Sequence, residues 1–353
     1  MKKKETTKDK ILGLLTEHAN SYISGQEIAD TLYLTRAAVW KAIKNLQEEG
    51  CRIEAVNNRG YCLVLESRPL NGKLIEKELT YAADKIQVIF LEETESTNED
   101  AKRLGAEGYV GKITPFDDLQ KVDAELKPVD NVVVVSDYQS KGKGRRGRSF
   151  SSPKGTGLYM SFLMHPQIRV EEAYMLTCAA AVAVARAISS VTGIEPQVKW
   201  VNDLYIGDKK VCGILTEGVL SMEAGGLDYA VVGIGVNIFA PNEGFPPEIK
   251  DVAGALYEGG EAPDNVRNRI CAAIIDEFLR ITDAGDRDFV REYRDRSNLI
   301  GHYVKVNPYG DSGKKLDGYA KVLDIDDDCY LMVEYENGTV EALSSGEVSV
   351  KKY

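Results

Sequence analysis

The chain has 353 residues, of which 43% are hydrophobic and 28% are charged, and its formal net charge is −11. A chain of this length is expected to form two or three domains, and its ordinary composition excludes a mainly disordered protein. The acidic balance argues against a protein that binds nucleic acid over its whole surface.

Several other classes of protein are also disfavoured. The longest apolar stretch, Thr177 to Ala187, is too short to span a bilayer. No apolar segment follows the basic residues at positions 2–4, so we expect no signal peptide and a cytoplasmic protein. The six cysteines and three histidines are scattered without Cys-x-x-Cys or zinc-ligand spacing, so we expect no metal site built by the protein.

Residues 1–66 differ in charge from the rest of the chain. They contain ten basic and nine acidic residues, a net charge of +1, which leaves −12 for the remainder. Ser24 is placed to cap a helix, with Glu27 three residues later as in a capping box. A small and less acidic module on an acidic body is compatible with DNA contact through that module alone.

A further helix is expected from Thr35, because Val39, Ile43 and Leu46 have the spacing of a core face. Trp40 is expected in the core as well. Two short strands follow, 53–56 and 61–64, which predicts a winged helix-turn-helix; the alternative is a small helical packing domain. The polar residues that lie largely outside the core face, and are candidates for DNA contact, are Thr35, Arg36, Lys41, Lys44, Asn45 and, on the wing, Arg59.

The rest of the chain divides into a linker, a body and a β-rich end. Residues 67–80 read as a linker, 81–297 mix strands with helices, and 298–353 carry short strands with a hairpin turn at Asn337-Gly338. We therefore expect an α+β protein with a mixed sheet in the body and a small β-barrel at the end. The strands expected in the body are 132–136, 158–164, 198–206, 211–217 and 229–236, and the helices are 171–192, 266–282 and 288–296. The polar stretch 105–130 is assigned no role.

Three segments in the body carry most of the functional information. The loop Gln139 to Arg148 places three glycines among five cations, a composition that suits close approach of the backbone to an anion. The run Val198 to Leu215 places two lysine positions and an Asn-Asp pair around a strand, turn and strand. Ser96-Thr97-Asn98 follows an apolar strand and could open a helix or contact a ligand. Each segment alone also has an ordinary structural explanation.

Together and in this order, the three segments resemble the biotin–protein ligase family. Val232 to Ile238, with its Gly-x-Gly-x-Asn pattern, is similar to a buried strand of that family. The resemblance extends over nearly the whole chain. It implies a winged helix-turn-helix like that of biotin-operon repressors, a central ligase domain related to class II synthetases, and an SH3-like C-terminal domain. The implied protein is a bifunctional biotin–protein ligase and biotin-operon repressor.

The resemblance also implies a reaction and its partners. Biotin and ATP would form biotinyl-5′-AMP, with Mg²⁺ on the polyphosphate, and the biotinyl group would pass to a lysine of a biotin carboxyl carrier protein. The protein would bind operator DNA as a homodimer when it holds the adenylate, and no membrane is involved. The residues implied to be catalytic are Lys210, Arg145 and Lys199; those implied to bind biotin or its adenylate are Ser96, Thr97, Asn98, Gln139, Lys143, Gly144, Arg145, Asn202, Asp203 and Lys210.

Two positions depart from the pattern of the family. Lys143 stands where arginine is usual, which exchanges a planar bidentate group for a point charge. Val201 stands where proline is usual, and we expect it to loosen the turn. Two rival functions remain open: a lipoate–protein ligase of the same fold, and a biotin-sensing DNA-binding repressor without catalysis.

Overall fold

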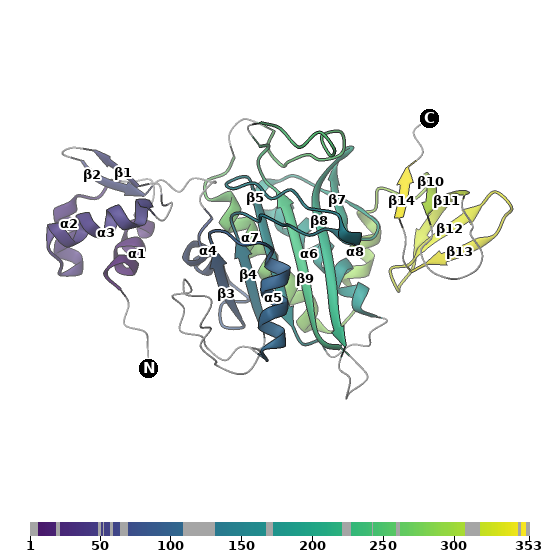
Figure 1. The fold of residues 1–353 in the computed structure, drawn as a ribbon, viewed down its shortest axis with the longest axis horizontal. Helices are drawn as coiled ribbons and strands as arrows, with labels where there is room; N and C mark the ends of the chain where they lie inside the picture. Colours follow the sequence, from purple (N-terminus) through teal and green to yellow (C-terminus); the bar gives the residue numbers. More distant parts are fainter. Residues whose placement is uncertain are drawn as a thin grey trace. The chain divides into compact units, whose positions relative to one another are not determined.

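The computed structural model describes residues 6–18, 22–48, 51, 53–56, 59–63, 70–108, 131–166, 172–220, 227–241, 243–258, 262–307, 318–344 and 347–350. The chain divides into two compact units. One contains residues 1–70 together with 261–268, and the other contains the remaining residues. Figure 1 shows the helices and strands of each unit along the chain.

The first unit is a three-helix module with a two-stranded wing. Ser24 caps its second helix by accepting a hydrogen bond from the backbone N–H of Glu27 at 3.0 Å. Gly60 has a φ of +102°, and a Cβ there would lie 2.2 Å from the carbonyl oxygen of Ile23, so only glycine suits this turn. The elements are α1 (Thr7–Glu17), α2 (Gly25–Leu32), α3 (Arg36–Glu48), β1 (Ile53–Val56) and β2 (Gly60–Leu63).

Helix α3 separates a buried face from an exposed one, as its spacing predicts. Val39, Ile43 and Leu46 are at most 2% exposed and pack into the core of this unit. The expectation that Trp40 belongs to this core is wrong, because its side chain is 59% exposed. Lys44 lies over the Trp40 ring, 5.7 Å from its centroid, so the indole lies on the same face as the basic residues.

The body of the second unit is built on a seven-stranded sheet with the order β3-β4-β5-β9-β8-β7-β6. Strands β3 and β4 pair in parallel, and the other neighbours pair antiparallel, which confirms a mixed sheet. The strands are β3 (Ile86–Leu91), β4 (Asn131–Ser136), β5 (Gly157–Met164), β6 (Gln197–Lys199), β7 (Asp203–Ile206), β8 (Lys209–Leu220) and β9 (Leu227–Asn237).

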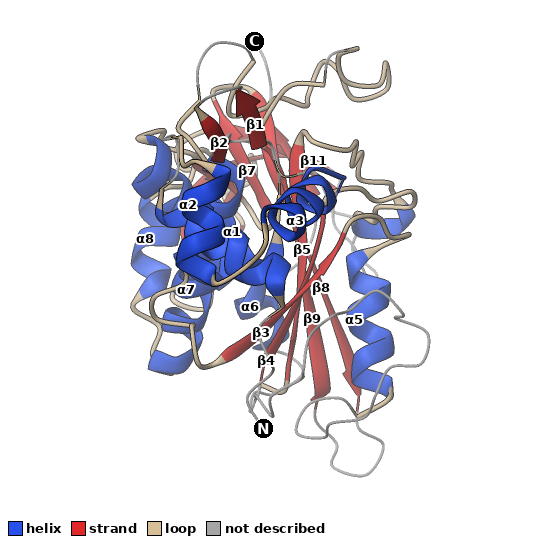
Figure 2. Cartoon of the chain, turned by 90° about the vertical axis from the view of Figure 1, so that its left-hand side faces the viewer, coloured by secondary structure: helices blue, strands red, loops and turns tan. Residues whose placement is uncertain are grey.

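Helices cover both faces of this sheet (Figure 2). Helix α5 (Thr97–Ala106) packs Ala101 and Leu104 against Val132 and Val134 of β4. On the opposite face, Phe162 of β5 packs against α7, with its ring 4.7 Å from that of Phe278. Alternation along the strands therefore buries both faces. The other helices of the body are α4 (Gly72–Glu78), α6 (Ala173–Thr192), α7 (Val266–Ala284) and α8 (Phe289–Asp295).

Several expected elements have different bounds in the structure. The expected strand 198–206 is two antiparallel strands, β6 and β7, separated by a turn at residues 200–202. Part of the expected linker, residues 72–78, forms helix α4. Helix α6 is long and apolar enough to cross a membrane by composition, but twelve of its 20 residues are buried within the protein. Packing in the body therefore accounts for its apolar character. The stretch 109–130 lies outside the described residues.

The C-terminal part is a five-stranded antiparallel sheet that contacts the body through backbone carbonyls and acidic turns. Trp200 Nε1 donates to the carbonyl oxygen of Cys329 at 2.9 Å, and Tyr174 Oη donates to that of Asp328 at 2.6 Å. Arg287 pairs with the Asp328 carboxylate. The strand order is β13-β12-β11-β10-β14, with β10 (Tyr303–Asn307), β11 (Gly318–Ile325), β12 (Leu331–Tyr335), β13 (Val340–Leu343) and β14 (Glu347–Val350).

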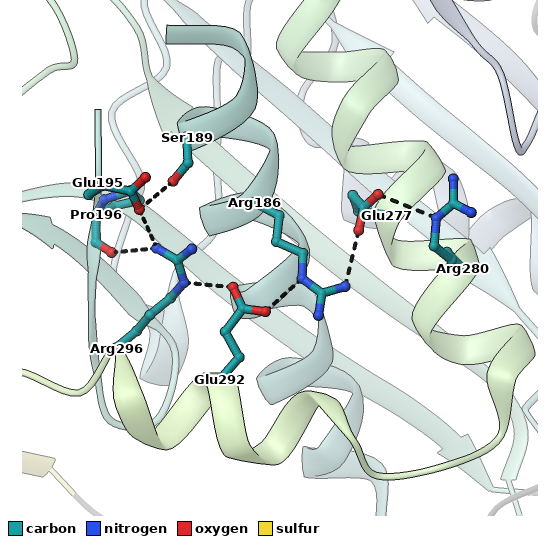
Figure 3. Close-up of polar contacts among 8 residues, drawn as sticks. All are labelled: Arg186, Ser189, Glu195, Pro196, Glu277, Arg280, Glu292 and Arg296. Carbon is teal, nitrogen blue, oxygen red and sulfur yellow. Dashed lines mark hydrogen bonds and ion pairs between the residues drawn. The ribbon is translucent and has the colours of Figure 1, made fainter. Parts of the chain in front are cut away.

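An ion-pair network fixes α8 against α6 (Figure 3). Glu292 accepts hydrogen bonds from Arg186 Nε at 2.7 Å and from Arg296 Nε at 2.8 Å. Arg186 continues to Glu277 of α7, and Arg296 continues to Glu195. The side chains of Arg186, Arg296 and Glu292 are at most 35% exposed, so water screens these contacts less than ordinary surface pairs.

We predict that Glu292→Gln lowers the free energy of unfolding by about 1–2 kcal/mol, because a carboxylate shared by two guanidinium groups becomes a neutral amide. Denaturant unfolding of the purified chain measures this. Asp295→Asn on the same helix is the control, since Asp295 is 68% exposed and lies 3.9 Å from Arg291. Equal unfolding midpoints for the two variants would contradict the importance of the network.

Candidate functional site

A cavity lies between α5, the loop 139–150 and the ends of β8 and β9. It is formed by segments that are far apart in the sequence. Polar side chains gather at the start of α5, here called the polar end, and Arg145 and Lys210 lie beside Asn202 and Asp203, here called the cationic end. The lining residues are Ser96, Thr97, Asn98, Gln139, Lys143, Gly144, Arg145, Phe150, Met160, Asn202, Lys210, Gly213, Ile214, Leu215, Gly233, Ile234 and Gly235.

The polar end is built on the first turn of α5. Ser96 occupies the N-cap position, but its side chain does not cap the helix. The backbone N–H of Thr97 donates instead to Gln139 Oε1 at 2.9 Å, and Gln139 Nε2 donates to Ser152 Oγ at 2.9 Å. The helix start is thus tied to the second wall of the cavity. Ser96, Thr97 and Asn98 are at most 5% exposed.

Glycines form the floor of the cavity. Gly233 and Gly235 of β9 leave room for neighbouring side chains: a Cβ at Gly233 would lie 2.0 Å from Asn98 Oδ1, and one at Gly235 would lie 2.5 Å from the Phe150 ring. Gly213 is the cross-strand partner of Gly235. The absence of side chains at these positions lets α5, Phe150 and any ligand approach the sheet closely.

Three cations line the cavity, and each has a partner. Lys143 Nζ lies 2.6 Å from Glu99 Oε1, and Lys210 Nζ lies 2.7 Å from Asp203 Oδ1. The hydrogen bonds from Lys143 and then from Lys102 hold the pKa of Glu99 below its usual value. The carboxylate therefore stays ionised at neutral pH and competes with an anionic ligand for Lys143.

Arg145 is held by a side chain that is itself fixed to the sheet. Arg145 Nη1 donates to Asn202 Oδ1 at 2.9 Å. Asn202 Nδ2 donates to the carbonyl oxygen of Ile214 at 2.9 Å, and Ile214 N–H donates to that of Asn202 at 2.9 Å. Val201, which is 7% exposed, follows a cis peptide bond, and its carbonyl oxygen accepts from Tyr293 Oη at 2.9 Å. This turn is tied to its surroundings at several atoms, unlike the loosened turn that the valine suggested.

The two adjacent lysines of β8 have different surroundings. Lys210 lines the cavity, and its backbone N–H donates to the carbonyl oxygen of Val252. Lys209 Nζ instead donates to the carbonyl oxygens of Lys250 and Asp251, both at 3.1 Å. Lys209 thus fastens the loop near residue 251, whereas Lys210 is the lysine that reaches the site.

A second cavity adjoins the first. Arg145, Asn202, Ile214 and Leu215 line both, so the two cavities form one two-part site. The second part is lined in addition by residues of α6, of β8 and of the C-terminal part: Ala173, Tyr174, Thr177, Val201, Thr216, Gly218 and Ser344. It offers an aromatic ring and hydroxyl groups rather than a further cluster of cations.

The structure gathers most of the residues that the sequence singled out. Those in the first cavity are Ser96, Thr97, Asn98, Gln139, Lys143, Gly144, Arg145, Asn202 and Lys210. Asp203 reaches the site only through Lys210. Lys199 does not line either cavity; its Nζ lies 5.1 Å from the centroid of the Tyr205 ring. The chemical roles assigned to these residues stay predictions.

Sequence reasoning missed two kinds of site residue. Phe150 lies just beyond the glycine-rich loop, and no motif marked it. Gly233 and Gly235 belong to the Gly-x-Gly strand, which the sequence predicts to be buried. Because these two residues have no side chain, the strand also forms the cavity floor. The spacing of the glycines was the available signal for this floor. Among the described residues no cluster of three or more histidine, cysteine or acidic side chains could hold a metal ion.

In the first unit, the candidate DNA-contact residues are all exposed to solvent. The side chains of Thr35, Arg36, Lys41, Lys44 and Asn45 on or beside α3 are exposed, as is Arg59 at the wing. Thr35 Oγ1 accepts from the backbone N–H of Ala38 at 3.2 Å and so caps α3. The helix therefore presents its basic face to solvent.

Three family models match the chain. They are the HTH domain at residues 7–62, the biotin/lipoate A/B protein ligase family at 113–237 and the biotin protein ligase C-terminal domain at 311–351. The bifunctional ligase/repressor BirA of Bacillus spizizenii is 31% identical over 97% of this chain and 98% of its own length. The chain belongs to the family of bifunctional biotin ligase/repressors.

Other ligase/repressors and solved structures agree with this assignment. BirA of Escherichia coli is 29% identical over 99% of this chain and 98% of its own. A biotin protein ligase from Aquifex aeolicus, solved in complex with biotin and ATP, superimposes with a TM-score of 0.55 at 27% identity. The match covers 76% of this chain and 99% of the Aquifex aeolicus chain. The expected fold class, a helix-turn-helix, a mixed-sheet ligase domain and a C-terminal β domain, is confirmed.

Proposed function

We propose that this ligase/repressor activates biotin with ATP to biotinyl-5′-AMP and transfers the biotinyl group to a lysine of a biotin carboxyl carrier protein. The observation that carries the proposal is the two-part site. Arg145 and Asn202 line both cavities, so they lie where two substrates would meet. The polar end suits the uncharged ureido ring of biotin, and the cationic end suits its carboxylate.

The first step brings two anions together, and the cations of the site lower their repulsion. The biotin carboxylate oxygen attacks the α-phosphorus of ATP, and pyrophosphate leaves. Lys210 and Arg145 supply positive charge beside the reacting groups. The nucleotide would occupy the second cavity, against Tyr174 and Ser344.

The second step transfers the acyl group. The neutral amine of the carrier lysine attacks the biotinyl carbonyl carbon, AMP leaves, and the amine loses a proton. Lys210 and Arg145 now stabilise charge on the phosphate that departs. Magnesium would be held mostly by phosphate oxygens and water, which fits a site in which the described residues offer no acidic cluster.

Two rival functions make different predictions in one assay. A lipoate ligase would exchange pyrophosphate into ATP with lipoate instead of biotin, and a sensor without catalysis would exchange with neither. We expect biotin-dependent exchange. The matching family model covers both biotin and lipoate ligases, whereas the relatives at full length are biotin ligase/repressors.

We further propose that the first unit binds operator DNA and that biotinyl-adenylate promotes this by dimerising the protein. One module of net charge +1 on a body of −12 makes few phosphate contacts and should bind weakly as a monomer. Two modules on a two-fold dimer would read a palindromic site together.

Lys210→Ala should lower the rate of biotinyl-adenylate formation about 10²–10³-fold, because one cation beside the reacting carboxylate is lost. Pyrophosphate exchange by the purified variant measures the effect. Lys209→Ala is the matched comparison and should stay within a few-fold of the wild type, since Lys209 contacts only loop carbonyls. Near-normal exchange by Lys210→Ala would refute the role of Lys210.

Arg145→Gly should release biotinyl-adenylate faster, because the contact between the glycine-rich loop and Asn202 is lost. The free adenylate would then biotinylate the lysines of an added bystander protein. Arg146→Gly is the control, because this variant removes the same charge from the same loop. Arg146 does not line either cavity, and its φ of +61° is one that glycine adopts freely. Equal bystander labelling by both variants would argue against a retaining role for Arg145.

Arg36→Ala should weaken binding to biotin-operon DNA without slowing ligation, since Arg36 lies on the exposed face of α3. We expect the adenylate to tighten wild-type binding and added salt to weaken it steeply. Gel shifts and size measurements on the same samples test this, with Lys10→Ala on α1 as the control. A protein that stays monomeric with saturating adenylate, or binds random DNA equally well, would contradict the proposal.

A further inference from the structure

The side-chain amide of Asn98 has hydrogen-bonding partners on both of its ends. Asn98 Nδ2 donates to Glu217 Oε2 at 2.8 Å, and the carbonyl oxygen of Leu215 lies 3.5 Å away. Asn98 Oδ1 accepts from Ser161 Oγ at 2.6 Å and lies over Gly233 on the cavity floor. Asn98 is only 5% exposed, so protein neighbours rather than bulk water determine which way its amide points.

Glu217 determines that orientation because an ionised carboxylate can only accept hydrogen bonds. If the amide turned over, Asn98 Oδ1 would face the Glu217 oxygen as a second acceptor. Lys102 holds the carboxylate in place: its Nζ lies 2.6 Å from Glu217 Oε1 and 3.0 Å from Glu99 Oε1. Burial alone would lower the pKa of Lys102, but its hydrogen bonds to the two carboxylates raise it.

Ser161 could support either orientation of the amide. Its hydroxyl oxygen lies 2.6 Å from Asn98 Oδ1 and 2.7 Å from Thr97 Oγ1, and it has one proton to donate. In the observed orientation that proton serves Asn98 Oδ1. In the reversed orientation Asn98 Nδ2 would donate to Ser161, which would donate to Thr97. The charge on Glu217 is therefore what separates the two arrangements.

We propose that Glu217, held by Lys102, is a positioning residue that determines whether Asn98 presents an acceptor or a donor to the cavity. It keeps the acceptor, Asn98 Oδ1, turned toward the ligand. The site therefore selects a ring that offers an N–H donor. A carbonyl oxygen has two lone pairs, so Asn98 Oδ1 can accept from the ligand while it accepts from Ser161. The inference rests on the proposed function, in which the ring is the ureido ring of biotin. Neither residue lines the cavity, and both act through Asn98.

Glu217→Gln tests this, because a neutral amide can either donate or accept and no longer penalises the reversed orientation. The substrates are biotin and the two cyclic carbamate analogues in which one or the other ring N–H is replaced by oxygen. For the wild-type protein, kcat/KM with at least one carbamate should be about tenfold or more below kcat/KM with biotin, which is the effect of losing one well-placed hydrogen bond. In Glu217→Gln the KM for biotin should rise about tenfold, kcat should change less than about twofold, and selectivity against that carbamate should fall about tenfold.

Lys102 supplies a second and milder variant. Lys102→Met leaves the carboxylate in place without its cation and should shift selectivity in the same direction, and Lys102→Arg should restore it. This pair decides the question if Glu217→Gln does not fold, as judged by its melting temperature. Glu92→Gln is the matched control, since Glu92 pairs with Lys154 outside both cavities and is 66% exposed.

Three results separate the possible failures. An unchanged KM and selectivity in Glu217→Gln would overturn the inference. A KM that rises equally for biotin and both carbamates would also overturn it, since that is the effect of a purely structural role. A wild-type protein that forms no adenylate with biotin would refute the proposed function itself.

Discussion

The site depends on the hydrogen bonds of Asn202. One amide side chain connects Arg145 of the glycine-rich loop to the backbone of Ile214 on β8. Its own backbone accepts from Ile214, so side chain and main chain are fixed by the same strand. An arginine on a loop with three glycines would otherwise sample many positions, at a cost in conformational entropy on binding. Strand β8 thereby orients the glycine-rich loop through Asn202, although this loop is not part of the sheet.

The turn at residues 200–202, which carries Asn202, is held by parts of the chain that are far from it in the sequence. Tyr293 of α8 donates to the carbonyl oxygen of Val201, and the neighbouring Trp200 donates to Cys329 of the C-terminal part. The ion pairs of Glu292 fix α8 against α6 (Figure 3). The C-terminal part and the helical face of the body thus contribute to the geometry of the site, although Ser344 is the one described residue of the C-terminal part that lines it.

Two of the three cations in the site are paired with acidic side chains. Glu99 and Asp203 neutralise Lys143 and Lys210, so an incoming carboxylate or phosphate replaces internal partners rather than meeting bare cations. This arrangement avoids repulsion among the cations in the ligand-free protein. It also means that the acidic residues of α5 belong to the working of the site. The basic face of α3 differs from the site, because its cations are exposed to solvent.

The sequence by itself determined the order of domains and the helix-turn-helix and, through the family resemblance, nine of the residues that line the first cavity. These features depend on local patterns: a cap at Ser24, the apolar spacing of α3, and glycines interleaved with cations. Only the tertiary structure decided that Trp40 faces solvent, that Lys199 lies away from the cavities, and that Glu217 and Lys102 stand behind Asn98. Helical periodicity places Trp40 next to a core residue but cannot tell how far the core extends. Pairing between β8 and α5 joins residues more than a hundred positions apart, and no local pattern contains that contact.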